Sequence, residues 1–84
     1  MRAARLVTGD RARTYGDATA LHERVAELWN GYLRAIGQRE LGPADVMLML
    51  ALMKIGRAAG GSFHLDNYVD GAGYVALAAG VGGK

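Results

Sequence analysis

The stretch 63–74 holds most of the side chains in this sequence that are suited to chemistry. Its polar members are His64, Asp66, Asn67, Tyr68, Asp70 and Tyr74. Asp66 and Asp70 are four residues apart, so on a helix they lie one turn apart on the same side. Asn67 flanks them. Oxygen ligands grouped in this way suit Mg²⁺ or Mn²⁺, which bind carboxylates, water and substrate phosphate. The stretch is therefore the first candidate for a functional site.

Two basic side chains precede this stretch and are suited to phosphate. Lys54 and Arg57 end an apolar segment, and a short break at 58–62 follows them. Because a short connection makes two helices antiparallel neighbours, we expect Lys54 and Arg57 to lie near Asp66 and Asp70. One interpretation is a catalytic metal and phosphate site, in which Asp70 is the essential ligand and Asp66 and Glu27 assist it. Lys54 and Arg57 would stabilise developing charge. The other is a structural salt-bridge network, with Asp66 as a helix N-cap.

An amphipathic helix is expected at 19–36. Apolar residues recur there at three- and four-residue steps, and Gly37 follows at a position where glycine often ends a helix. Glu23 and Glu27 fall on the polar face of this helix. They are either solvated or, in an oligomer or under the N-terminal arm, a pair of ligands for a divalent cation.

The first eighteen residues read as an N-terminal arm. Residues 2–8 form at most a short helix, and 9–17 reads as a loop because two glycines and several turn-forming polar residues interrupt it. Arg11 and Arg13 are the charged tips of this loop. They are either solvated or a clamp for phosphate or carboxylate, since a guanidinium presents a fork of donors to such groups.

Two further helices are expected, at 44–58 and 66–79. The helix at 44–58 contains eight consecutive apolar residues, 46–53, which predicts a position at the centre of the fold or at a subunit interface. The glycine-rich end, 80–84, is expected to be a flexible tail. Together the three helices predict a small all-α bundle.

Length and composition predict one small domain that self-associates. A chain of 84 residues has no room for a second core, and its own core is marginal without a partner. The chain has no cysteine, so disulfides cannot stabilise it, and we expect a homo-oligomer. A net charge of +2 without a basic stripe makes nucleic acid an unlikely partner. No segment reads as a secretory signal or a membrane span, so a cytoplasmic location is expected.

Several short motifs resemble those of a family of small phage and prophage proteins. They are Gly9-Asp10-Arg11 with Tyr15-Gly16-Asp17, Leu28-Trp29-Asn30 with Tyr32-Leu33, Asp45-Val46 through Met49, Lys54-Ile55-Gly56-Arg57, and Asp66-Asn67-Tyr68-Val69-Asp70-Gly71-Ala72-Gly73-Tyr74. The resemblance covers nearly the whole chain. It implies an all-α fold and a phage or prophage origin, and hence the cytoplasm of a bacterial host.

A remoter resemblance is to the MazG-like, all-α nucleotide pyrophosphohydrolases. Those enzymes hold Mg²⁺ with an ExxE pair on one helix and an ExxD pair on the next. The matching positions here are Glu23 with Glu27 and Asp66 with Asp70, each pair four residues apart rather than three. The resemblance implies a metal-dependent nucleotide hydrolase, or a relative that binds nucleotides without cleaving them.

Three functions follow from these observations. The first is metal-dependent hydrolysis of a nucleotide, and the second is nucleotide binding without catalysis, which would sequester a host signalling nucleotide. The third is binding to a protein, such as inhibition of a host defence complex, through an exposed apolar face. The residues predicted to bind ligand or phosphate are Arg11, Arg57, His64, Asn67 and Tyr74.

Overall fold

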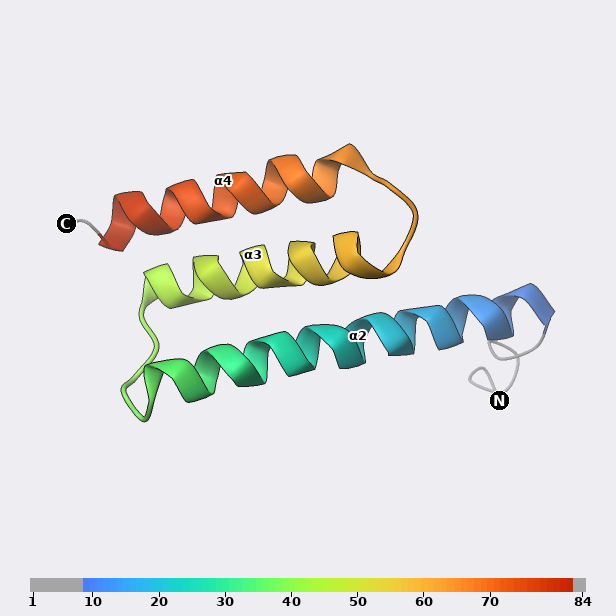
Figure 1. The fold of residues 1–84 in the computed structure, drawn as a ribbon, viewed down its shortest axis with the longest axis horizontal. Helices are drawn as coiled ribbons and strands as arrows, with labels where there is room; N and C mark the ends of the chain where they lie inside the picture. The colour runs from blue at the N-terminus through green and yellow to red at the C-terminus, as the bar shows by residue number, and fades with distance from the viewer. Residues whose placement is uncertain (1–8, 83–84) are drawn as a thin grey trace.

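The computed structural model describes residues 9–82 of the chain, and their side chains from residue 18 onward. The described part consists of three α-helices: α2 at Gly9–Ile36, α3 at Pro43–Gly60 and α4 at Leu65–Gly82. α3 lies between the other two and packs against both (Figure 1). The predicted all-α fold is confirmed, and so is the central position of the apolar helix. The short helix predicted at 2–8 lies outside the described residues.

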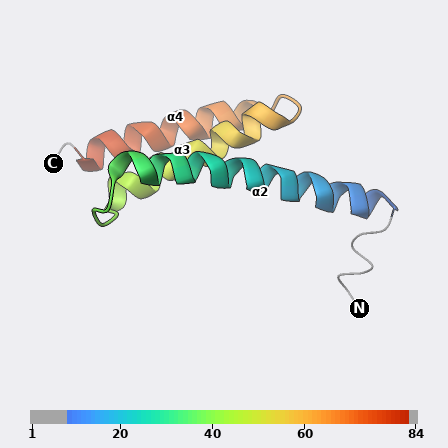
Figure 2. The ribbon, with the colours of Figure 1, turned by 60° about the horizontal axis from the view of Figure 1, so that its bottom comes forward.

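The first helix begins ten residues earlier than predicted. α2 starts at Gly9, so residues 9–17 are helical and not the expected loop. Once a helix has formed, each further residue adds a backbone hydrogen bond at little cost, and Arg11, Ala12 and Arg13 are strong helix formers. These effects outweigh the unfavourable helix propensity of the two glycines. The early turns carry α2 beyond the ends of α3 and α4 (Figure 2).

The last helix extends further than predicted. Residues 80–82, which the sequence assigned to a flexible tail, form the final turn of α4. A Cβ atom on Gly82 would lie 3.5 Å from the Cβ of Ala44 at the start of α3. The final turn therefore packs closely against α3, and this contact holds the glycine-rich end in the helix. Gly37 follows α2 with a φ of +77°, as expected for a glycine that ends a helix.

The contact between α2 and α3 is close and specific. The side chain of Val25 is buried, and a Cβ atom on Gly56 would lie only 3.0 Å from Val25 Cγ2, so the two helices approach closely at this crossing. Trp29 Nε1 donates a hydrogen bond of 2.6 Å to the backbone oxygen of Met49. Glu23 and Glu27 are exposed on the far side of α2, as its amphipathic pattern predicts.

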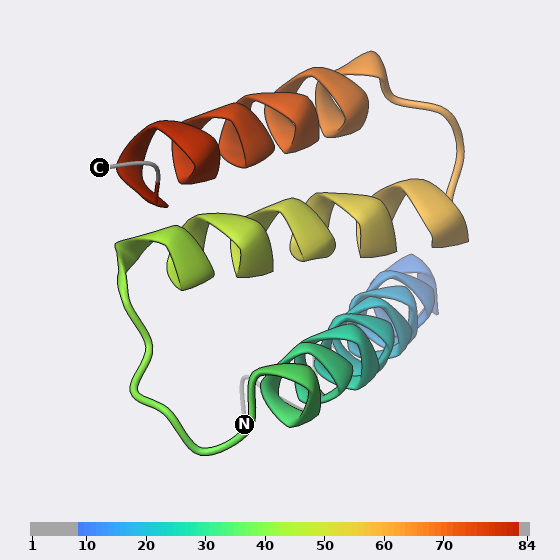
Figure 3. The ribbon, with the colours of Figure 1, turned by 60° about the vertical axis from the view of Figure 1, so that its left-hand side comes forward.

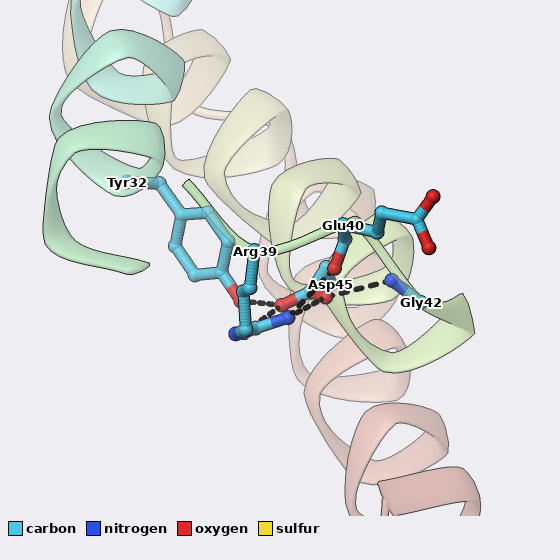
Figure 4. A network of polar contacts seen from close by, with 5 residues as sticks. All are labelled: Tyr32, Arg39, Glu40, Gly42 and Asp45. Atoms are coloured by element: carbon cyan, nitrogen blue, oxygen red, sulfur yellow. Dashed lines mark hydrogen bonds and ion pairs between the residues drawn. The ribbon is translucent and has the colours of Figure 1, made fainter. Parts of the chain in front are cut away.

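The connection between α2 and α3 is held by one buried carboxylate, that of Asp45 (Figure 4). Arg39 donates to both of its oxygens, at 2.6 and 2.7 Å, and Tyr32 Oη donates at 2.6 Å. The backbone N–H of Gly42 completes the set at 2.8 Å. These bonds join the end of α2, the connector and the first turn of α3, so the network is structural.

The same network shifts the pKa values of its members. The hydrogen bond from Arg39 is the main cause that holds the pKa of Asp45 far below its usual range, and Gly42 and Tyr32 add to it. The hydrogen bond to Asp45 raises the pKa of the Tyr32 phenol, and it also raises the pKa of Arg39. Asp45 is therefore ionised wherever the fold is intact near neutral pH.

The three helices form a row and not a closed bundle. α4 packs against α3 but makes no contact with α2 within the described residues. Figure 3 shows α3 and α4 side by side, with α2 crossing them at an angle. The buried apolar side chains are correspondingly few, namely Val25, Met49, Ala51 and Ala78. One face of α4 is consequently left without a neighbour.

Candidate functional site

A pocket of about 420 Å³ lies where α3 turns into α4, beside the middle of α2. We call it the turn pocket. It is lined by Ala20, Leu21 and Arg24 of α2, Arg57 and Gly60 of α3, Gly61, Ser62 and His64 of the turn, and Asn67 of α4. Three helices thus contribute to a site at the start of the polar stretch 63–74.

Arg24 is held at the pocket by the end of α3. Its Nε donates a hydrogen bond of 3.2 Å to the backbone oxygen of Gly56. The guanidinium also lies against Gly60, where a Cβ atom would overlap it. A cation near a helix C-terminus is stabilised by the helix dipole, and a guanidinium keeps further donors when one N–H is used. Arg24 can therefore bind an anion while it stays attached to α3.

The charges in the turn pocket are all of one sign. Arg24 and Arg57 both line it, and none of the lining residues is acidic. Of the residues whose side chains are described, no carboxylate forms an ion pair with either guanidinium. Ser62 Oγ lies within hydrogen-bond distance of His64 Nε2, at 3.3 Å. Two guanidinium groups beside a hydroxyl and an imidazole make an arrangement suited to an anion.

Asn67 is the buried polar residue of the pocket. Its side chain is 4% exposed, and its Oδ1 has no hydrogen-bond partner in the described part of the chain. Its backbone N–H donates to the oxygen of His64 at 3.1 Å, which fixes the start of α4. A buried acceptor without a donor costs free energy, so Oδ1 is an unsatisfied polar atom of a residue that lines the turn pocket.

The structure brings together some of the residues predicted as a site and separates others. Arg57, His64 and Asn67 meet in the turn pocket, as the short α3–α4 connection predicts. Tyr74 is half-buried on α4 and does not line this pocket. The side chain of Arg11 lies outside the part of the chain whose side chains are described.

The expected pairing of α3 with α4 is present at Lys54. Its Nζ lies 3.2 Å from Asp70 Oδ2, and Lys54 is the more buried partner. This contact matches the structural interpretation of the two residues. Neither Lys54 nor Asp70 lines the turn pocket, and Asp66 is exposed outside it. The catalytic roles assigned to these three residues stay predictions.

The predicted metal ligands do not form a cluster. Glu23 and Glu27 lie on the exposed face of α2, and Asp66 and Asp70 lie on α4, which does not contact α2. Among the described side chains, no three His, Asp or Glu residues are placed to share a metal ion. The four carboxylates therefore do not fit one Mg²⁺ or Mn²⁺ ion within a single copy of the chain.

Two of the polar side chains that line the pocket were not predicted. Arg24 lies next to Val25 on the buried side of α2, and Ser62 lies in the turn. A basic residue beside the apolar stripe of an amphipathic helix could have indicated a site residue such as Arg24, because its long side chain can extend along the neighbouring helix. The sequence carries no comparable signal for Ser62.

The family described as "Domain of unknown function (DUF6378)" matches residues 1–82. The chain belongs to this family. It is also 43% identical over 75 residues to the Gene 55 protein of Mycobacterium phage L5, a match covering 89% of this chain and 46% of that protein. The Gene 55 protein of Mycobacterium phage D29 is 38% identical over 72 residues, covering 86% of this chain and 45% of that protein.

These matches confirm the predicted resemblance to a phage protein family. The chain spans slightly less than half the length of the two curated relatives. No solved structure matches it. None of the helices in residues 9–82 is long and apolar enough to cross a membrane. The resemblance to MazG-like enzymes stays a prediction.

Proposed function

We propose that this DUF6378 protein binds a phosphate-bearing small molecule of nucleotide size in the turn pocket, and that this binding needs no metal ion. The observation that carries the proposal is the meeting of Arg24 and Arg57 in a pocket whose described lining residues include no acidic side chain. Each guanidinium presents several donors in a planar fork that matches phosphate oxygens. Because no carboxylate among the side chains described from residue 18 onward pairs with them, an anion from solution can bind these donors.

The size and the remaining polar groups support a ligand larger than inorganic phosphate. A volume of about 420 Å³ falls in the range of roughly 300–1,000 Å³ typical of small-molecule sites. Ser62 and His64 add hydrogen-bonding groups at the rim. The unpartnered Oδ1 of Asn67 calls for a donor, such as a sugar hydroxyl or a base amino group. A nucleotide carries both a phosphate and such donors.

Binding is expected to stabilise the protein against heat. A ligand at about a hundred times its dissociation constant adds roughly 2.7 kcal/mol, which raises the melting temperature of a small domain by roughly 10 to 20 °C. The experiment is a thermal-shift panel of ATP, GTP, AMP, pyrophosphate and phosphate in EDTA and in Mg²⁺, followed by calorimetry of any hit. Stabilisation by a nucleotide in EDTA without product supports the proposal.

Two results contradict the proposal in different ways. Stabilisation that appears only with Mg²⁺ and is accompanied by pyrophosphate release would favour the MazG-like hydrolase. No stabilisation by any phosphate compound in either buffer would remove small-molecule phosphate binding altogether. Chromatography of the reaction mixture after prolonged incubation measures the products.

Substituting Gly60 with alanine tests the position of Arg24. The new Cβ would overlap the guanidinium of Arg24, so this flexible side chain must move away from the end of α3. We expect nucleotide affinity to fall several-fold while stability changes little, because alanine suits a helix better than glycine. Calorimetry and thermal melting measure the two quantities.

The matched control is Gly31→Ala in α2. A Cβ atom at Gly31 meets nothing closer than Arg34 Nη2 at 3.9 Å, and Gly31 is remote from the pocket lining. This variant should bind as tightly as the unchanged protein. Equal affinities for the two glycine variants would show that Arg24 does not act in binding.

A further inference from the structure

α4 is apolar on the side that faces away from α3. From Gly71 to Gly82 the helix has no charged residue, and α3 is the sole helix of the described chain that packs against it. Leu65 and Val69 are about 60% exposed, and Leu77 is 54% exposed. A helix that is apolar on most of its sides is normally buried on most of its sides. In this chain more than half of the residues of α4 are exposed, although its apolar composition is typical of a buried helix.

The uncovered surface is large for a chain of this size. The accessible area is 6191 Å², whereas a compact monomer of 8.9 kDa is expected to expose about 4,800 Å². The excess, about 1,400 Å², exceeds the roughly 800 Å² that each partner buries in an interface of standard size. The molecule as a whole therefore leaves enough area uncovered for an interface of standard size, and the exposed side of α4 supplies a share of it.

A groove of about 270 Å³ runs between α3 and α4 on this surface. It is lined by Ala51, Lys54, Ile55, Ala58, Asn67, Tyr68, Gly71, Ala72 and Val75. Lys54 is its sole charged lining residue and is already paired with Asp70. Ile55, Tyr68 and Val75 border the groove and are each about half exposed. The small residues form the floor and the large ones form the walls.

We propose that two copies of this chain associate through the α4 face, which consists of Ile55, Leu65, Tyr68, Val69 and Val75. A two-fold interface uses the same patch on both copies, so the patch must contain both projections and a place to receive them. The α4 face has both, because the exposed side chains of α4 lie beside the α3–α4 groove. This inference is independent of the ligand proposed for the turn pocket.

Charge favours a second copy over an unrelated partner. The α4 face carries no unpaired charge of its own, so two copies meet without placing like charges together or burying an uncompensated one. An interface that selects a different protein commonly uses complementary charges for this purpose. The face has no such group to offer an acidic or a basic partner.

The test is the oligomeric state of the purified chain and of two matched variants. Light scattering after size-exclusion chromatography should give twice the chain mass of 8.9 kDa at micromolar concentrations. Val69→Lys places a charge in the α4 face and should give a monomer with unchanged helical content. Leu33→Lys makes the same change at an exposed apolar residue of α2, outside the face, and should remain a dimer.

A second measurement does not depend on how Val69→Lys folds. The chain has no cysteine, so Ile55→Cys and Leu33→Cys each introduce a unique thiol. In the dimer the thiol at position 55 should react with maleimide at least several-fold more slowly than the thiol at position 33, and dilution should remove the difference. A monomeric unchanged protein would overturn the proposal, as would equal labelling rates at high concentration. A dimer that Val69→Lys leaves intact would overturn it too, and would point to another surface.

Discussion

Asp45→Ala is expected to lower the melting temperature of the protein by roughly 5–15 °C. The carboxylate accepts hydrogen bonds from Arg39, Tyr32 and the backbone of Gly42, and it is 5% exposed. Its removal leaves a guanidinium, a phenol and an amide without their partner at the junction of α2 and α3. Thermal melting followed by circular dichroism measures the loss. Glu27→Ala, which removes an exposed carboxylate from α2, should change the melting temperature little.

The same carboxylate predicts how stability depends on pH. The pKa of Asp45 is lowered in the folded protein, so its stabilising contribution is complete above its unfolded value of 3.8 and is lost as the pH falls through the folded pKa. The free energy of unfolding should therefore decline from about pH 4.5 downward, more steeply in the unchanged protein than in Asp45→Asn. Urea titrations at several pH values measure it. Parallel curves for the two proteins would contradict the depressed pKa.

Arg57→Gln is expected to weaken nucleotide binding at least tenfold. A hydrogen bond to a charged group contributes roughly 1.5–3 kcal/mol, and a factor of ten in affinity corresponds to about 1.4 kcal/mol. Arg57 is exposed at the pocket and has no ion-pair partner among the described side chains, so its loss should leave stability nearly unchanged. Calorimetry with the best nucleotide from the panel gives the dissociation constants.

Arg34→Gln is the matched control for this change. Arg34 is an exposed arginine in the last turn of α2, and it does not line the turn pocket. Both substitutions remove one positive charge, so a general effect of net charge would lower the nucleotide affinity of both variants equally. A dissociation constant for Arg57→Gln within twofold of the Arg34→Gln value would exclude a direct contact between Arg57 and the ligand.

The sequence predicts the helices well because their signals are local. The apolar stripe of 19–36 and the unbroken run of 46–53 are periodic patterns that neighbouring residues reveal. The short connection after Arg57 predicts that α3 and α4 are antiparallel, and this places Lys54 next to Asp70. The meeting of Arg57, His64 and Asn67 in one pocket follows from the same connection.

The remaining features depend on contacts between distant parts of the chain. Arg24 reaches the pocket because α2 crosses α3 at Gly56, and no local pattern gives this crossing. The hydrogen bond between Tyr32 and Asp45 likewise joins two helices. Residues 9–17 contain glycines, which disfavour a helix, together with strong helix formers. The turn-forming residues by themselves predict a loop there, and this prediction is wrong. The metal prediction rests on the four-residue spacing of Asp66 and Asp70, and spacing along one helix does not show whether a third ligand lies nearby.

Amide chemical-shift mapping tests most directly whether the turn pocket binds a nucleotide. Titration of the best nucleotide from the panel into ¹⁵N-labelled protein in EDTA should shift the amides of Gly60, Gly61, Ser62 and Asn67, which line the pocket. It should leave the amides of the α2–α3 connector, 37–42, in place. Shifts confined to other parts of the chain, or no shifts at saturating nucleotide, would contradict the account.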